Sequence, residues 1–259
     1  MLLAALGAAF GMLIVLAQPA AAAGVSNPGN FGATVLAGSS LTLSGGTAFS
    51  IGVPACSDGV DNDLAGGTDF PADTSCTAAN DANERLAGLQ AYVQPKVNTA
   101  VSGAGVINLA IAGYVFPPGE ICVAAIGTWC LNATIAGDGA TVGSINPEGP
   151  TAAAGDGTIS LPVDLRVELD AVVGFPGLSA NCRILPATAT LSSANYNKTT
   201  GNATLANTAA VNVPAVAGCG SFLGLSYDSL INGQLGLPGT ANASLLVQIR
   251  NAAGQPVLP

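Results

Sequence analysis

The sequence predicts an all-β protein, an antiparallel β-sandwich with Greek-key-like connections. Three observations support this fold class: residues 159–173 alternate between apolar and charged side chains, small and β-branched residues dominate the chain, and turn residues recur at short intervals. Alternation with a period of two is typical of a strand in a sheet that has one wet face. Short strands separated by turn signals favour a sandwich.

Seven segments are expected to form strands. The clearest is Ile159–Val173, in which every second residue is apolar over the central stretch. The pairs Asp138-Gly139 and Asp156-Gly157 are of the kind that closes hairpins. The other expected strands are Ala33–Leu43, Val101–Phe116, Cys122–Ile135, Ala187–Ser193, Asn202–Val213 and Ala243–Ile249.

A helical stripe is hard to find in this chain. The best candidate is Ala82–Val93, which Pro95 would end. At the two ends of the mature chain, Gly24–Asn30 is expected to form a flexible lead and Ala252–Pro259 a frayed tail.

The first residues predict export. Met1–Leu16 is almost wholly apolar, Gln18-Pro19 ends the run, and the alanines up to Ala23 suit a signal peptidase. We therefore expect a signal peptide over residues 1–23 and a secreted or cell-surface protein. The alternative is an uncleaved membrane anchor, because the run is only slightly short of the roughly 20 residues that span a bilayer. The remaining chain divides into an N-terminal lead and strand (24–55), an acidic loop (56–84) and a β-sandwich body (85–259).

The cysteines agree with an oxidising compartment. There are six, and no histidine or CxxC pair that would favour zinc. Six cysteines allow fifteen pairings. Proximity in the sequence suggests Cys56–Cys76, Cys122–Cys130 and Cys182–Cys219.

Charge is concentrated in the acidic loop. Seven of the chain's fifteen acidic residues lie between Cys56 and Glu84, with no Lys or Arg among them. Such a segment repels itself unless a cation binds within it. The spacing Asp61-x-Asp63, followed by a glycine bend at Gly66, is that of a calcium loop. A solvated loop held only by a disulfide is the alternative.

The loop resembles an Asp-rich motif of bacterial secreted proteins, CxDGxDNDxDGxxDxxxDxxC, which is similar to thrombospondin type 3 repeats. It matches that motif at Cys56, Asp58, Gly59, Asp61, Asn62, Asp63, Gly66, Asp69, Asp73 and Cys76. Ala65 stands where the motif has Asp, so one ligand is missing and weak binding is expected, with a Kd around 10⁻⁴ to 10⁻³ M. The rest of the chain loosely resembles uncharacterised actinobacterial secreted proteins, which carry no known function with them.

The resemblance implies a calcium site with ordered ligands. Asp61 and Asp63 would be the first two, a carbonyl near Gly67 a neutral one, and Asp69 and Asp73 would close the shell. The remaining acids, Asp58, Asp81 and Glu84, would serve as reserve ligands or a second site. Calcium fits better than magnesium because a flexible loop with six or seven oxygens suits the larger ion.

Most catalytic machinery is excluded by composition. Without histidine there is no Ser-His-Asp or Cys-His arrangement. Glu168 and Asp170 lie about 7 Å apart along one strand face, within the range of inverting glycosidases. Arg166 and Asp164 share that face, which favours an exposed charge ladder instead.

We therefore expect a non-enzymatic structural or binding protein, stabilised by calcium. A carbohydrate-binding or carbohydrate-hydrolysing module is the alternative, with Trp129 in an aromatic platform or in the core, and an envelope- or lipid-associated protein is a third. An acidic chain with a net charge of −9 does not favour nucleic acid or an anionic membrane as a partner. An extracellular protein or polysaccharide fits better, and a membrane contact is expected only through an uncleaved signal.

Overall fold

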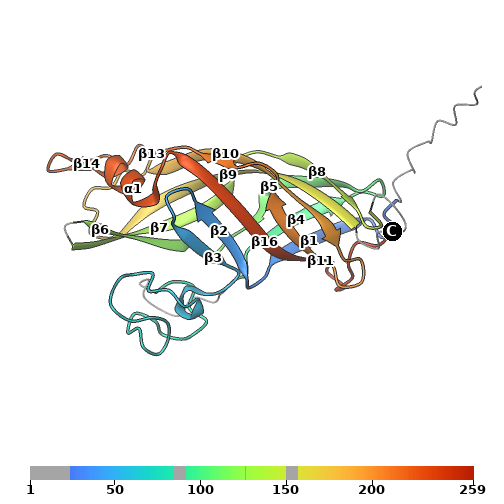
Figure 1. Cartoon of the computed structure of the whole chain (residues 1–259), viewed down its shortest axis with the longest axis horizontal. Coiled ribbons are helices and arrows are strands. Elements are labelled where there is room, and N and C mark those ends of the chain that lie inside the picture. The colour runs from blue at the N-terminus through green and yellow to red at the C-terminus, as the bar shows by residue number, and fades with distance from the viewer. Residues whose placement is uncertain (1–23, 85–91, 126, 150–156) are drawn as a thin grey trace, which may run out of the picture.

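The structure is a computed structural model that describes residues 24–84, 92–125, 127–149 and 157–259 (Figure 1). Almost all of its elements are strands, so the predicted all-β fold is confirmed. In chain order they are β1 (Gly29–Val35), β2 (Ser39–Leu43), β3 (Ala48–Ile51), the 3₁₀ turn η1 (Ala55–Ser57), β4 (Lys96–Val101), β5 (Val106–Val115), β6 (Gly119–Ala125), β7 (Gly127–Gly137), β8 (Thr141–Asn146), β9 (Gly157–Val173), β10 (Arg183–Tyr196), β11 (Asn202–Asn207), β12 (Val211–Val213), β13 (Val216–Ala217), β14 (Ser221–Phe222), β15 (Leu225–Ser226), α1 (Tyr227–Leu235) and β16 (Gly239–Asn251).

The large antiparallel sheet curves until β9 pairs with β10. Its two halves therefore face each other across an apolar core, as the two layers of a sandwich do. Its hydrogen-bonded neighbours run β10, β11, β16, β1, β4, β5, β8 and β9, and β9 pairs in turn with β10. The hairpin β6–β7 extends the sheet beyond β9, and β2 and β12 pair with the N-terminal half of β16. Because β16 returns to lie between β1 and β11, the connections are Greek-key-like.

Two apolar cores follow one another along the long strands. β9 contributes Leu161 to the first core and Leu169 to the second, both almost fully buried. The first core fills the closed part of the sheet. The second lies between β7, β9, β10 and α1, where Trp129, Phe175 and Tyr227 pack edge to face with ring centroids 5.0 to 5.8 Å apart. The long alternating strands therefore hold both ends of the molecule together.

Several expected strands are broken by turns. Ala33–Leu43 is divided between β1 and β2, Val101–Phe116 between β4 and β5, and Cys122–Ile135 between β6 and β7. Gly105 shows the physical reason in one case. Its φ is +73°, and a Cβ there would lie 2.2 Å from the carbonyl oxygen of Ile145. The residues around Gly105 have the composition of a strand, so the sequence pattern alone does not reveal this turn.

Helix α1 was not expected from the sequence. Ser226 caps its N-terminus by accepting a hydrogen bond from the backbone N–H of Ser229, and Gly236 ends it in the left-handed conformation. The view that only Ala82–Val93 could be helical was therefore wrong. Residues 82–84 of that candidate are not helical, and residues 85–91 lie outside the described residues.

Both ends of the described chain are packed rather than loose. Val25 is buried and its N–H donates to the carbonyl of Gly103, so the segment 24–30 is not a flexible lead. The tail is not frayed either. Val257 is fully buried, and its backbone N–H and carbonyl both bond to the hydroxyl of Tyr196. These two segments lie side by side, since Ser26 N–H donates to the carbonyl of Leu258.

All six cysteines form disulfides, in the pairs suggested by proximity in the sequence. The three bonds are Cys56–Cys76, Cys122–Cys130 and Cys182–Cys219. They indicate an oxidising, extracellular type of environment. The expected signal peptide, residues 1–23, lies outside the described residues, and no helix in the described part of the chain is long and apolar enough to cross a membrane.

Candidate metal centre

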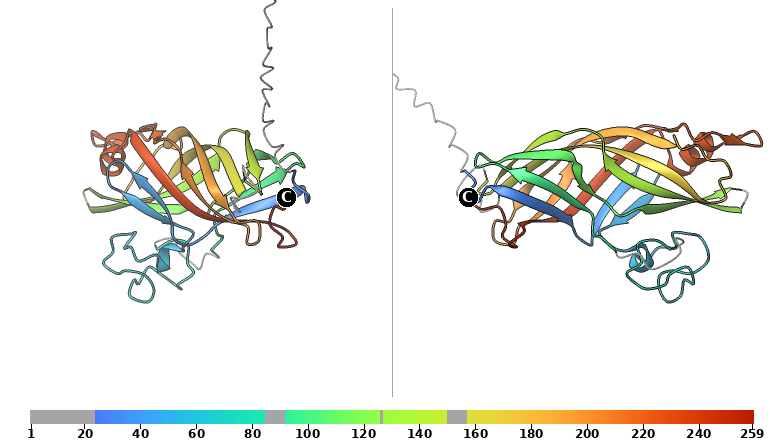
Figure 2. Two further views of the ribbon diagram at one scale, coloured as in Figure 1. Left: turned by 45° about the vertical axis from the view of Figure 1, so that its right-hand side comes forward. Right: turned by 180° about the vertical axis from the view of Figure 1, so that it is seen from behind.

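The acidic loop leaves the sheet after β3 and forms an irregular lobe beside it (Figure 2). The Cys56–Cys76 disulfide closes it, and Cys56 N–H donates to the carbonyl of Asp81. The carbonyl oxygen of Asp63 lies 4.0 Å from the sulfur of Cys130, so the lobe contacts the disulfide of the β6–β7 hairpin. The loop is thus fixed at its neck and along one side.

Two adjacent glycines let the loop fold tightly. Gly66 has a φ of +95°, which confirms the expected bend there. Gly67 lies so close to the next turn of chain that a Cβ would be 2.5 Å from the Cα of Asp73. The first half of the loop is therefore pressed against the segment that carries Asp73.

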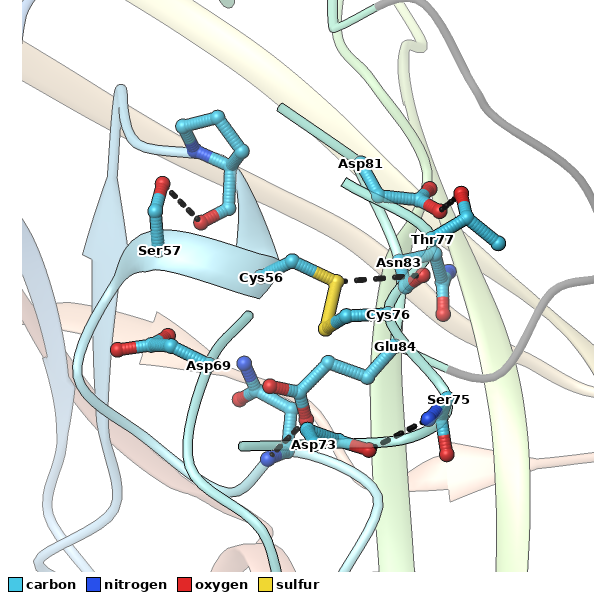
Figure 3. The surroundings of a disulfide bond; sticks show 12 residues. Cys56, Ser57, Asp69, Asp73, Ser75, Cys76, Thr77, Asp81, Asn83 and Glu84 are labelled. Atoms are coloured by element: carbon cyan, nitrogen blue, oxygen red, sulfur yellow. Dashed lines mark hydrogen bonds between the residues drawn. A yellow bond between two sulfur atoms is a disulfide. The ribbon is translucent and has the colours of Figure 1, made fainter. Parts of the chain in front are cut away.

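Four carboxylates converge inside the lobe. Atoms of Asp61, Asp63, Asp73 and Glu84 all lie within 4.8 Å of one another. Asp63, Asp73 and Glu84 are at most 2 % exposed, while Asp61 is half-buried. Figure 3 shows Asp73 and Glu84 together on one side of the Cys56–Cys76 disulfide, with Asp81 on the other. Burying several carboxylates in one place is costly without a compensating charge.

Both oxygens of Asp63 accept hydrogen bonds, from Ala65 N–H and from the Ser75 hydroxyl, and one oxygen of each of the other three carboxylates accepts from a backbone N–H. Glu84 Oε2 accepts from the backbone N–H groups of Asn62 and Asp63, at 2.6 and 3.1 Å. Asp73 Oδ1 accepts from Ser75 N–H at 2.7 Å, and Asp61 Oδ2 from Gly66 N–H at 3.2 Å. These bonds orient the carboxylates.

The second oxygen of three of them has no hydrogen-bond partner. Asp61 Oδ1, Asp73 Oδ2 and Glu84 Oε1 are all buried, with no hydrogen-bond partner among the described residues. Buried polar atoms are almost always hydrogen-bonded, so three orphans within one cluster require an explanation. Oriented, buried and unpartnered carboxylate oxygens are the donors that a hard cation uses.

The electrostatics of Glu84 reflect the same crowding. The pKa of Glu84 is raised from 4.5 to about 7, mainly by burial and also by the neighbouring Asp73 and Asp63, while hydrogen bonds from the backbone N–H groups of Asn62 and Asp63 oppose the shift. Asp73 and Glu84 form no ion pair within the described part of the chain, and the adjacent Arg85 lies outside it. The carboxylate of Glu84 therefore becomes more stable if a cation is close to it.

The expected ligands are brought together only in part. Asp61, Asp63 and Asp73 are in the cluster. Asp69 lies outside it, with both oxygens accepting from Gly59 N–H. Asp58 also lies outside and accepts from Val60 N–H, and burial raises its pKa.

Glu84 is the residue that sequence reasoning undervalued. The resemblance assigns it only as a reserve ligand or part of a second site. In the structure it is fully buried and accepts hydrogen bonds from the loop's first half. A signal was available, since a lone Glu directly after an Asp-rich loop can supply two oxygens. Asp81, the other reserve residue, is buried apart from the cluster and accepts from the hydroxyl of Thr77.

The other candidate sites have less structural support than the carboxylate cluster. The further groupings of acids with cysteine use sulfurs that are already in disulfides, which removes their thiolates as ligands. Trp129 is only 9 % exposed and belongs to the second core, so it is not part of a sugar-stacking platform. Arg166 forms ion pairs with Glu168 and Asp138, as expected for a charge ladder on an exposed strand face.

Comparison with protein-family models, with curated proteins and with solved structures returned no significant match to this chain. What can be said of its function therefore depends on the geometry described above. That geometry defines an all-β, disulfide-bonded protein with a buried carboxylate cluster that could hold a metal ion.

Proposed function

We propose that this chain is an exported, non-enzymatic structural or binding protein whose acidic loop binds calcium. The proposal depends on one observation, the three buried carboxylate oxygens of Asp61, Asp73 and Glu84 that have no hydrogen-bond partner in the part of the chain that the structure describes. The three disulfides support export.

The ligands of the cluster suit calcium better than magnesium. Calcium binds oxygens at 2.3–2.6 Å, so ligands on opposite sides of the ion are about 5 Å apart. The carboxylate atoms of the cluster all lie within 4.8 Å of one another. Magnesium would demand strict octahedral geometry from four carboxylates, all of which already accept hydrogen bonds from backbone N–H groups of the loop.

The burial of the cluster favours a structural role for the ion. Asp63, Asp73 and Glu84 are nearly inaccessible to solvent, which leaves little room for a substrate to approach. An ion here would connect both halves of the loop to Glu84, and the loop to the neck closed by Cys56–Cys76. Because the unfolded chain lacks this arrangement, calcium binding stabilises the folded state.

Thermal unfolding with EGTA and then with calcium tests the proposal. With a Kd between 10⁻⁴ and 10⁻³ M, 10 mM calcium adds about 1.4 to 2.7 kcal/mol to the free energy of unfolding. For a chain of this size that corresponds to a rise in Tm of about 3 to 10 °C. Asp61→Asn and Asp73→Asn should each remove most of the rise.

Asp69→Asn is the matched control. It makes the same change of charge within the same loop but lies outside the cluster, and Asn tolerates the φ of +57° found there. This variant should keep the response to calcium. No rise in Tm for the unmodified chain, or an equal loss in all three variants, would contradict the proposed site.

A further inference from the structure

The hairpin β14–β15 projects from the end of the molecule opposite the C-terminus (Figure 1). Ser221 pairs with Ser226 and Phe222 with Leu225, so the turn consists of only Leu223 and Gly224. Both turn residues have positive φ, +49° and +81°. Two-residue turns with this geometry normally use Asn-Gly or Asp-Gly.

Leu223 is an unexpected residue at this turn. A leucine is disfavoured in the left-handed conformation because its Cβ crowds the backbone. It is also 86 % exposed, more than any other large apolar side chain described in the structure. Neither local conformation nor burial accounts for a leucine here, and strained residues of this kind concentrate where they contact a ligand.

The apolar side chains beside it extend the same surface. Phe222 is 39 % and Leu225 is 36 % exposed, so Phe222, Leu223 and Leu225 form an apolar tip, which we call the hairpin tip. The segment 211–227 contains no charged residue. The first charge after it, Asp228, is turned inward, where it accepts a hydrogen bond from Cys219 N–H at 2.8 Å.

The hairpin tip stands on a rigid base. The Cys182–Cys219 disulfide joins the segment just before β14 to the segment just before β10, and Tyr227 N–H donates to the carbonyl of Gly220 across the hairpin's ends. Tyr227 is fully buried against Trp129 and Phe175. The base keeps the tip extended, so its leucine is held in solvent rather than folding back onto the protein.

The segments around this base are also free of charge. Neither 121–137, which supplies Trp129, nor 171–182, which supplies Phe175, contains an acidic or basic residue. The rest of the chain carries the whole net charge of −9. This end of the molecule can therefore approach an apolar phase without desolvating a charge from these segments.

We propose that the hairpin tip inserts its three apolar side chains into the surface of a lipid layer. A stable protein interface buries about 1,600 Å² in total and uses polar rim contacts, which three side chains on a narrow tip do not supply. A lipid surface requires only apolar groups that reach below the headgroups. The net negative charge favours zwitterionic over anionic headgroups.

Binding should be reversible and insensitive to salt. With only three partly exposed apolar side chains, the tip should bind no more tightly than a single acyl chain, whose partition constant is about 10⁴ M⁻¹. Because the tip has no charged group, screening should not weaken it. The calcium site lies in a separate lobe, so this interaction does not depend on it.

Flotation of the full disulfide-bonded chain with phosphatidylcholine vesicles in EGTA tests the proposal. We expect the chain to float with the vesicles and Leu223→Asn to bind at least tenfold more weakly. Asn fits a positive φ at this turn, so this variant should fold and melt no lower than the unmodified chain. Val142→Thr, at a strand position that is 63 % exposed on β8, is the matched control and should bind normally.

Four results would overturn the proposal. They are no flotation of the unmodified chain, equal binding by Leu223→Asn, loss of binding in 0.5 M NaCl, and a dimer in sedimentation velocity that Leu223→Asn dissociates. The last would assign the tip to a second copy of this chain. Because the assay is done without calcium, its failure leaves the metal site untouched, and failure of the metal site leaves the flotation result standing.

Discussion

Glu84 connects the acidic loop to the chain that follows it. Its Oε2 accepts two backbone hydrogen bonds from the loop, and its Oε1 is buried without a partner. A carboxyl group in this position favours the folded state when it is protonated or when a cation is bound to it. It destabilises the folded state when it is ionised with no cation nearby. Its protonation should therefore be visible in the pH dependence of stability.

In EGTA, the free energy of unfolding should fall as pH rises from about 5 to 7.5. The pKa of Glu84 is raised by burial from 4.5 to about 7, so between these values the folded chain holds a proton that the unfolded chain has lost. The destabilisation is absent below the lower value and complete above the higher one, and amounts to at most a few kcal/mol.

Denaturant unfolding at several pH values, beside Glu84→Gln, measures this effect. The variant should lose less stability over the same range, since its side chain does not titrate. Parallel pH profiles for the two proteins would show that Glu84 is not the group responsible. Saturating calcium should flatten or reverse the slope in the unmodified chain, because the cation favours the carboxylate.

A second residue, Tyr196, fixes the C-terminal segment. Its buried hydroxyl accepts from the N–H of Val257 and donates to the carbonyl of the same residue. Tyr196→Phe leaves both groups unpaired and should lower the free energy of unfolding by about 1 to 3 kcal/mol. Tyr92→Phe is the control, because the Tyr92 hydroxyl is buried with no hydrogen-bond partner among the described residues, and its loss should be nearly neutral. Equal effects in denaturant titrations would contradict this account of the tail.

At the scale of elements, the strands with clear alternation were the most predictable. β9 was expected at 159–173 and begins only two residues earlier. The turns that divide the β-rich stretches were not predicted, because the turn residues are similar in composition to the strands on either side. The helix α1 was missed because its apolar residues are few and its signals are caps, Ser226 and Gly236, rather than periodicity.

Helix α1 depends on one asparagine for its contact with the sheet. Asn232 accepts from the N–H of Val216 at 2.7 Å and donates to its carbonyl at 3.0 Å, so it pairs with β13 as another strand would. Asn232→Ala leaves two backbone groups of a buried residue unsatisfied and should cost about 2 kcal/mol or more in denaturant unfolding. Gln234→Ala, at an exposed position of the same helix, should have little effect. Similar losses in both variants would contradict this pairing.

At the scale of the whole molecule, the chain places its candidate surfaces apart. The carboxylate cluster lies in a lobe beside the sheet, and the hairpin tip lies at one end of the long axis (Figures 1 and 2). The chain termini of the described residues meet at the other end. The two long-strand cores join these regions, so calcium binding in the lobe should stabilise the fold through Cys56–Cys76 and the contact with Cys130.

Only one part of the carboxylate cluster could be predicted from the sequence, the local spacing of its first two aspartates. Asp61 and Asp63 alternate in a short motif, so their convergence follows from the backbone. The membership of Glu84 and the exclusion of Asp69 depend on the close approach of Gly67 to Asp73 and on the fold of the neck. Those contacts join positions that no local pattern relates. The hairpin tip was unseen for a similar reason, because only the structure shows that Leu223 is exposed and at positive φ.

Calorimetric titration of calcium into the oxidised, chelator-treated chain at pH 7.4 tests the central claim most directly. We expect one ion per chain with a Kd of about 10⁻⁴ to 10⁻³ M, weaker binding of magnesium, and loss of the binding heat in Asp73→Asn but not in Asp69→Asn. Absence of calcium binding to the unmodified chain, or binding that Asp73→Asn retains unchanged, would contradict the claim that the buried carboxylates form a calcium site.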